Sequence, residues 1–379
     1  MIKVLVFIDW FTPAFKAGGP IQSISNLVKH LGKDMDISIV TSDRDLGDKE
    51  GFSSVPLNVW FNLDGARIIY LEPKNQNKKK YKDILQEQAY DSIYFNSLFS
   101  VKFTLLPLWI VRKSKAKLIL APRGMLGSGA LNIKKKRKKF FLKTFQAYGI
   151  AKKITWHATA ESEVEEIKKH FGNQLDVRLA PNFSGKLPAK TVSKQKDVDQ
   201  LNLFFLSRIA EKKNLKGAIS FLQQVPDKYK IRFTIIGPIG ESDYWQECQK
   251  MKEKLPSSIK TQYLGAVQNA NLVNHLNQQH FLILPTFHEN FGHVIMESFQ
   301  NGCPVIISDQ TPWRNLEEKG IGWDISLNKP KQFVQVIEKA TAMSQSEYQK
   351  MSQASYDFAK YFTEDPEVLE ANRKLFDLT

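Results

Sequence analysis

Two glutamates, Glu289 and Glu297, frame a short turn that could hold an anionic ligand. Glu289 follows the apolar run 281–285, which is typical of a buried parallel strand, and Glu297 lies about two helical turns further on. Where a strand ends and a helix begins, free amide N–H groups and the positive helix end attract phosphate. The pattern therefore indicates a ligand with phosphate in its middle, held by amides, and with hydroxyl-bearing sugars near the carboxylates.

Two basic residues, Arg208 and Lys213, stand five positions apart at a second strand-to-helix turn, after the apolar run 203–206. Both can point into one opening, where the rigid fork of Arg208 and the mobile ammonium of Lys213 suit a diphosphate. The alternative interpretation is that both are charges at the start of a helix, in water.

Two glycines, Gly18 and Gly19, follow the first expected strand and precede Pro20, which suits the first position of a helix. Such glycines let a backbone turn tightly and approach a ligand closely, although a plain strand-to-helix turn would use the same residues. Arg123 follows the expected strand 117–121 and places a fixed cation at another strand end.

The chain has 379 residues, 42% hydrophobic and 25% charged, which is typical of globular and not of disordered proteins. Its length suggests two domains of roughly 150–200 residues each. The two cysteines form no disulfide framework, so we expect a reducing cytoplasm. We expect no secretory signal, and the best candidate for a membrane span, 98–111, is shorter than the ~20 residues that a bilayer needs.

The formal net charge is +15, and much of it is local. The segment 134–153 holds nine Lys or Arg and no acid, interleaved with Phe140, Phe141, Leu142 and Phe145. A basic amphipathic helix of this kind favours an anionic membrane surface. A solvated basic face and a contact with nucleic acid stay open as alternatives.

Short apolar runs alternate with helical patterns, which predicts parallel sheets covered on both faces. The expected strands are 3–9, 37–41, 67–70, 92–96, 117–121, 154–158 and 177–180, then 203–206, 232–236, 261–264, 281–284 and 305–307. The helices expected in the first half are 21–31, 100–111, 133–145 and 162–171. We predict a first domain over 1–185, a linker over 186–200, a second domain over 201–360 and a last helix over 361–379.

The segment around the two glutamates resembles the Glu-x7-Glu signature of the retaining nucleotide-sugar glycosyltransferases of family 4, which have the GT-B fold. The resemblance includes Pro285, Phe291-Gly292 and Asn301-Gly302-Cys303-Pro304. Pro122-Arg123-Gly124-Met125 resembles a branch of this family in which Arg stands where many relatives have His. The resemblance covers nearly the whole chain and is clearest over 200–325.

The resemblance implies two Rossmann-like, doubly wound domains that face each other across a cleft, with the C-terminal helix crossing back to the first domain. It implies that Glu297 binds the ribose of the donor and that Glu289 binds hydroxyls of the transferred sugar. Arg123 could bind diphosphate or an anionic acceptor. The other implied donor contacts are Arg208 and Lys213 as a diphosphate clamp, the loop of Gly18 and Gly19, and the amides of Asn290, Phe291 and Gly292.

The expected activity is retaining transfer of a sugar from a nucleotide diphosphate sugar to a hydroxyl of a glycan or lipid-linked glycan, with no metal and no other cofactor. The basic segment suggests an enzyme peripheral on the inner face of the cell membrane that serves bacterial surface polysaccharide synthesis, and we expect no nucleic-acid partner. Two alternatives stay open, a same-fold epimerase or phosphorylase and a basic nucleic-acid-binding α/β protein.

Overall fold

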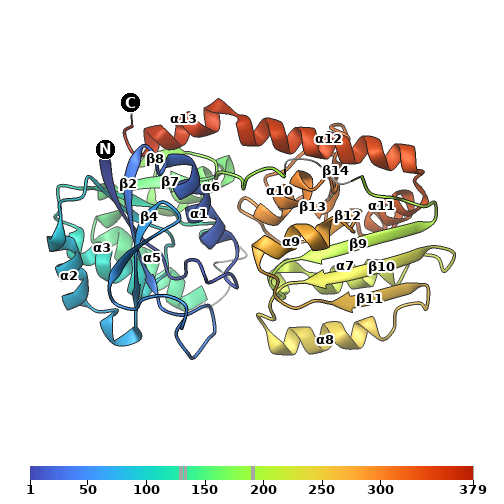
Figure 1. Cartoon of the computed structure of the whole chain (residues 1–379), viewed down its shortest axis with the longest axis horizontal. Helices are drawn as coiled ribbons and strands as arrows, with labels where there is room; N and C mark the ends of the chain where they lie inside the picture. Colours follow the sequence, from blue (N-terminus) through green and yellow to red (C-terminus); the bar gives the residue numbers. More distant parts are fainter. Residues whose placement is uncertain (128–130, 132–134, 189–192, 379) are drawn as a thin grey trace. The chain divides into compact units, whose positions relative to one another are not determined.

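The computed structural model describes the chain apart from residues 128–130, 132–134, 189–192 and 379 (Figure 1). The chain divides into two compact units, one of Met1–Phe183 with Asp365–Thr379 and one of Ser184–Glu364. Each unit is built on one largely parallel sheet with helices between its strands, so the predicted α/β fold class is confirmed.

An eight-stranded sheet forms the first unit, in the order β3-β4-β2-β1-β5-β6-β7-β8. Its neighbouring strands are parallel except for β3 and β4, which are antiparallel. The strands are β1 (Ile2–Phe7), β2 (Met35–Ser42), β3 (Trp60–Leu63), β4 (Ala66–Leu71), β5 (Ser92–Phe95), β6 (Lys117–Leu120), β7 (Thr155–Ala158) and β8 (Asp176–Leu179).

Helices cover both faces of this sheet. Leu5 and Phe7 of β1 pack into one apolar cluster and Val4 and Val6 into another, because successive side chains of a strand point to opposite faces. The helices are α1 (Gly19–Leu31), α2 (Lys78–Glu87), α3 (Leu106–Val111), α5 (Lys135–Ala147), α6 (Glu161–Phe171) and α13 (Pro366–Leu375), with short helical turns η1 (Pro73–Asn75), η2 (Val101–Leu105) and η3 (Ile150–Lys153).

Among the strands and α-helices described in this unit, β3 and α2 were not predicted. The strand β3 has four residues and pairs with β4 alone at the sheet edge, so it lacks a long apolar run. The helix α2 buries only Tyr81 and Ile84 and is otherwise polar, so its apolar periodicity is weak. The helix predicted over 100–111 consists of η2 and α3, which meet just before Pro107, a residue without an N–H to donate.

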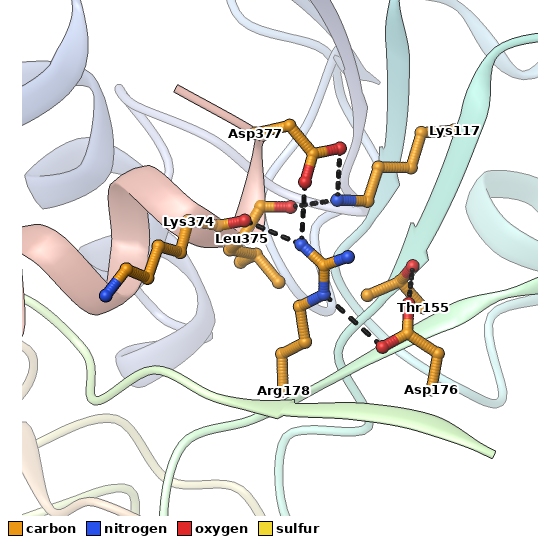
Figure 2. A network of polar contacts seen from close by, with 7 residues as sticks. All are labelled: Lys117, Thr155, Asp176, Arg178, Lys374, Leu375 and Asp377. Atoms are coloured by element: carbon orange, nitrogen blue, oxygen red, sulfur yellow. Dashed lines mark hydrogen bonds and ion pairs between the residues drawn. The ribbon is translucent and has the colours of Figure 1, made fainter. Parts of the chain in front are cut away.

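The last helix, α13, belongs to the first unit, as predicted. It is separated from α12 (Gln345–Glu364) at Asp365, whose side chain accepts a hydrogen bond from the amide of Glu367, and Pro366 begins the new helix. Figure 2 shows how its end is held: Asp377 accepts from Lys117 Nζ at 2.7 Å and from Arg178 Nη1 at 2.8 Å. Two sheet strands thereby hold the end of the chain.

Six parallel strands form the sheet of the second unit, in the order β11-β10-β9-β12-β13-β14. All five strands predicted here are present, and β14 is an addition. The strands are β9 (Gln200–Leu206), β10 (Lys230–Ile236), β11 (Ile259–Tyr263), β12 (Phe281–Leu284), β13 (Val305–Ser308) and β14 (Gly322–Ile325). The helices, besides α12, are η4 (Glu211–Lys213), α7 (Leu215–Leu222), α8 (Ser242–Lys252), α9 (Asn269–Leu276), α10 (His293–Gln300) and α11 (Pro330–Ala342).

The segment predicted as a linker, 186–200, falls within the second unit, and 189–192 lie outside the described residues. Its end is packed onto this unit, because Lys196 is only 2% exposed and its Nζ donates to the carbonyls of Thr341 at 2.8 Å and Asp197 at 2.9 Å.

The strand order reverses once in each sheet. In the second unit β9, β10 and β11 are added in one direction and β12 then pairs on the other side of β9. In the first unit the same reversal lies between β1 and β5. The carboxyl ends of strands at such a reversal are the usual ligand-binding position of open α/β sheets. Among the described residues, no helix combines the length and the apolar character needed to cross a bilayer.

Candidate functional site

An ion pair between Lys213 and Glu289 lies at the strand reversal of the second unit. Lys213 follows β9 and Glu289 follows β12, its neighbour in the sheet, and Lys213 Nζ donates to Glu289 Oε1. Their side chains are 17% and 14% exposed, so the pair is mostly removed from water but still reachable. The structure thus brings together two predicted residues that are 76 positions apart in the sequence.

Glu289 is held as a carboxylate. Burial raises its pKa, but Lys213, Lys212 and His288 together lower it by more, so that the pKa lies below its ordinary value. The two loops that carry the pair are also tied to each other. Phe287 N donates to the carbonyl of Lys212 at 2.9 Å, and Asn214 Nδ2 donates to the carbonyl of Pro285 at 2.9 Å. The positions of both charges are therefore set before any ligand arrives.

Arg208 lies at the same sheet end but outside this pair. Its side chain is exposed, and a Cβ added at Gly240 would lie 2.8 Å from its Cγ and Cδ, so its stem packs closely on that glycine. Within the described parts of the chain, no hydrogen bond or ion pair of the guanidinium is found. The structure therefore places Arg208 beside Lys213 along the chain but not in contact with Glu289.

The turn into α10 is shaped by Gly292. This residue has φ 78°, in the left-handed region, and its carbonyl accepts from the amide of Ile295 at 2.8 Å to start the helix. The neighbouring Phe291 is 5% exposed, and its carbonyl accepts from Trp313 Nε1 at 2.5 Å. Asn290, Phe291 and Gly292 thus form the approach to the N-terminus of α10, where the helix dipole is positive.

Glu297 lies within α10, and burial raises its pKa to about 7. When the pKa of a carboxyl is higher in the folded protein than in the unfolded one, the protein becomes less stable as the pH rises. The loss begins near the pKa of the unfolded state, 4.5, and is complete above the pKa of the folded state. A carboxylate kept at a cost in stability is typical of a functional position.

We expect the free energy of unfolding of the wild type to fall between about pH 5 and pH 8 by on the order of 1–3 kcal/mol more than that of Glu297→Gln. Urea titrations of both proteins at the two pH values measure this difference. Identical pH dependence in the two proteins would show that Glu297 is not held in a desolvated position.

His288 was not assigned a role from the sequence. Its Nε2 is buried and, among the described residues, has no hydrogen-bond partner. Burial, with Lys212 close by, lowers its pKa to about 4, so the imidazole is neutral at neutral pH. His288 is thus a buried, neutral side chain next to Glu289 in the sequence, and the residue type alone gave no signal of this.

The glycine pair of the first unit lies at its own strand reversal. Gly19 begins α1, and Gly18 precedes it with φ 67°. The loop before them is anchored by Asp45, which was also not predicted: this residue is 3% exposed, and its carboxylate accepts from the amides of Phe15 at 2.8 Å and Lys16 at 3.1 Å. Asp45 could have been found from the sequence, because it is an acidic residue shortly after the end of a buried strand, β2.

Arg123 is fixed at the carboxyl end of β6 by three neutral acceptors. Its Nε, Nη1 and Nη2 donate to Asn96 Oδ1 at 2.7 Å, Asn182 Oδ1 at 2.5 Å and Tyr94 Oη at 2.8 Å. These acceptors come from distant parts of the sequence. They hold the guanidinium rigidly and leave two of its five N–H donors for a further ligand.

The next residues in this network define the direction of its hydrogen bonds. His157 Nε2 lies 2.7 Å from the carbonyl of Ala180, which can only accept, so Nδ1 accepts from Tyr94 Oη–H at 2.7 Å. Burial raises the pKa of Tyr94 to about 12 and lowers that of His157 to about 3, so both stay neutral. The amide of Gly124 donates to the buried Glu163 at 2.6 Å, which holds the turn after Arg123.

The basic segment 134–153 forms α5 and η3; Lys134 lies outside the described residues. Phe145 is 4% exposed, and Phe141 and Leu142 pack partly buried against the same core, whereas Phe140 is 71% exposed. The apolar side of this helix is therefore occupied by the protein's own core, and Phe140 does not belong to it.

No metal-binding cluster is found in the described parts of the chain: they contain no group of three or more His, Cys, Asp or Glu arranged to hold an ion. That no metal takes part in the function remains a prediction.

Known proteins resemble this chain in a family model that matches its second unit and in the fold of the whole chain. Residues 188–358 match the family model of the glycosyl transferases group 1. The sucrose-phosphate synthase of Thermosynechococcus elongatus is similar in fold, with a TM-score of 0.74 and 14% identity over 100% of both chains. Anabaena Alr3699/HepE, solved with UDP and glucose, has a TM-score of 0.71 at 14% identity over 100% of this chain and 99% of its own. WaaG, a glycosyltransferase involved in lipopolysaccharide biosynthesis, has a TM-score of 0.68 at 13% identity over 100% of this chain and 99% of its own. None of the curated proteins matches the chain.

Proposed function

We propose that the chain is a group 1 glycosyl transferase, the family whose model matches residues 188–358, and that it moves a sugar from a nucleotide diphosphate sugar to an acceptor hydroxyl with retention of the anomeric configuration. The preformed pair of Lys213 and Glu289 at the ends of β9 and β12 carries this proposal. A cation and a carboxylate at one point suit the junction of a sugar with its diphosphate, because the cation binds the phosphate and the carboxylate binds sugar hydroxyls.

In the proposed mechanism Lys213 and Arg208 stabilise the diphosphate as it leaves. Negative charge builds on the phosphate oxygen while the bond to the sugar breaks. Preorganised cations therefore stabilise the transition state more than the ground state. Glu289 holds hydroxyls of the sugar as it becomes oxocarbenium-like. The acceptor oxygen attacks from the face that the diphosphate leaves, and the departing phosphate oxygen takes the acceptor's proton.

The other donor contacts follow from the same placement. Glu297 would bind the ribose hydroxyls, and the amides of Asn290, Phe291 and Gly292 would bind phosphate at the start of α10. In the first unit, the loop of Gly18 and Gly19, anchored by Asp45, would bind the donor diphosphate. Arg123 is held rigidly by three neutral acceptors, so its positive charge is not neutralised by them. It would therefore bind an anion, either a diphosphate or an anionic acceptor.

We further propose that the acceptor is a glycan or a polyprenol-linked glycan, that the enzyme acts at the inner face of the cell membrane, and that it serves bacterial surface polysaccharide synthesis. The basic segment around α5 supports a lipid-linked acceptor, because anionic lipid would attract it.

The test is sugar transfer from α-linked UDP- and GDP-sugars to a polyprenyl diphosphate-linked sugar, with the product's anomeric configuration read by NMR. We expect an α-linked product, and we expect the rate to stay unchanged when EDTA removes divalent metal. A β-linked product would contradict retention. A rate that EDTA abolishes and Mg²⁺ restores would contradict a cation clamp made by the protein alone.

A further inference from the structure

One acid-free stretch of the first unit carries the entire positive excess of the chain. Between Asp91 and Glu161 there are fifteen Lys or Arg and no Asp or Glu, which equals the formal net charge of +15. The rest of the chain therefore has as many acidic as basic residues. Charge segregated in this way creates a strong field over one part of the molecule.

Many of these charges lie on the outside of neighbouring elements. Trp109 of α3 and Tyr148, which directly follows α5, meet edge to face, with their ring centroids 5.7 Å apart. Phe99 and Phe141 form a second such contact at 5.3 Å. The exposed basic residues of the described part of this stretch are Lys102, Lys113, Lys115, Lys136, Arg137, Lys139, Lys143, Lys152 and Lys153.

Large apolar side chains are exposed among these charges. Val101 of η2 is 65% exposed, Trp109 of α3 is 42% exposed, Phe140 of α5 is 71% exposed, and Tyr148 just after α5 is 68% exposed. Apolar side chains exposed to water would gain free energy of burial if another surface covered them, so a group of them often marks an interaction site. We call this surface, made of these four residues and the nine basic ones, the basic aromatic face.

We propose that the basic aromatic face docks onto an anionic lipid bilayer, with Trp109 and Tyr148 at the headgroup level and the lysines against the lipid phosphates. Trp and Tyr are the residues that prefer this level, and each Lys or Arg near it adds electrostatic attraction. This inference rests on the proposed function, since it gives the enzyme its place next to a lipid-linked acceptor. It differs from insertion of one amphipathic helix, because the apolar side of α5 is buried in the core.

The packing of the aromatic rings favours a bilayer over a nucleic acid. Single-stranded nucleic acid needs free aromatic faces for base stacking. Arg112 lies over the ring of Trp109 at 4.0 Å, and Lys138 lies over the ring of Phe99 at 5.0 Å, so each of these rings has a face covered by a cation. The apolar side chains of Val101 and Phe140 gain nothing from a phosphate backbone but are stabilised in lipid.

Sedimentation with vesicles tests the charges. The full chain should bind vesicles of phosphatidylcholine mixed with phosphatidylglycerol and not those of phosphatidylcholine alone. Changing Lys136, Lys139 and Lys143 to Gln should weaken binding roughly 100-fold. The matched control changes Lys250, Lys254 and Lys331 of the second unit, also exposed, to Gln and should bind as the wild type does. Equal binding to both kinds of vesicle, or equal loss in both variants, would overturn the proposal.

Quenching of tryptophan fluorescence by brominated phosphatidylcholine in the mixed vesicles tests the aromatic part. We expect quenching in the wild type and its loss in Trp109→Phe, because the other described tryptophans are more buried. Unchanged quenching in the variant, or tight salt-sensitive RNA binding without vesicle binding, would overturn the proposal. Nucleotide binding is measured separately, so a chain that binds UDP or GDP but no vesicles would refute only this inference.

Discussion

Replacing Glu289 by glutamine is expected to lower the rate of sugar transfer by roughly 10²–10³-fold. This is the usual effect of removing one preorganised polar contact with a transition state. The amide has the same shape but no charge, so it cannot stabilise the positive charge that develops on the sugar. Nucleotide binding should stay within a few-fold of the wild type, because Lys213 remains and is released from its ion pair.

The matched control is Glu247→Gln. Glu247 also pairs with a lysine of the β9 turn region, Lys216, but its side chain is 58% exposed. An exposed pair contributes little, so this variant should transfer sugar at the wild-type rate. Initial rates of transfer and calorimetric dissociation constants measure both variants. If Glu289→Gln transferred sugar as fast as Glu247→Gln, Glu289 would have no role in the reaction.

The double change of Arg208→Ala and Lys213→Ala is expected to weaken nucleotide binding by at least roughly 100-fold. Each charge-assisted hydrogen bond to phosphate contributes about 1.5–3 kcal/mol, and both are removed. Loss of Lys213 also removes the main cation beside Glu289, which leaves a buried carboxylate facing the diphosphate. Both effects act in the same direction.

A lysine three positions away provides the control. Lys216→Ala removes a cation of the same kind that pairs with Glu247 at the surface, so its nucleotide binding should equal that of the wild type. Thermal melting of each variant shows whether the second unit stays folded. An equal loss of binding in Lys216→Ala would indicate a general effect of net charge and contradict a specific clamp.

Most strands of the second unit could be predicted because β9, β10, β12 and β13 each contain a run of buried, mostly apolar side chains, whereas β14, with Gly322 and Asp324, was missed. The prediction of 281–284 for β12 matches the structure residue for residue, since all four side chains are buried. Polar or short elements were missed: α2 buries only two side chains, and β3 has a partner on one side only. Periodicity detects an element only where the core imposes it.

The contact between Lys213 and Glu289 could not be read from local sequence. It depends on β12 pairing with β9 rather than with β11, which precedes it, and strand order is set by packing over the whole sheet. The resemblance to a family assigned both residues to one site. It did not reach Asp45, His288 or the acceptors of Arg123, because these partners come from segments that no shared motif connects.

The most direct test of the proposed donor site is a calorimetric titration of the wild type and of the Arg208→Ala, Lys213→Ala variant with UDP and with GDP. We expect micromolar binding of one nucleotide to the wild type and its loss in the variant, which would locate the donor site at the ends of β9 and β12. Binding of neither nucleotide to the folded wild type, or equal binding to both proteins, would contradict it.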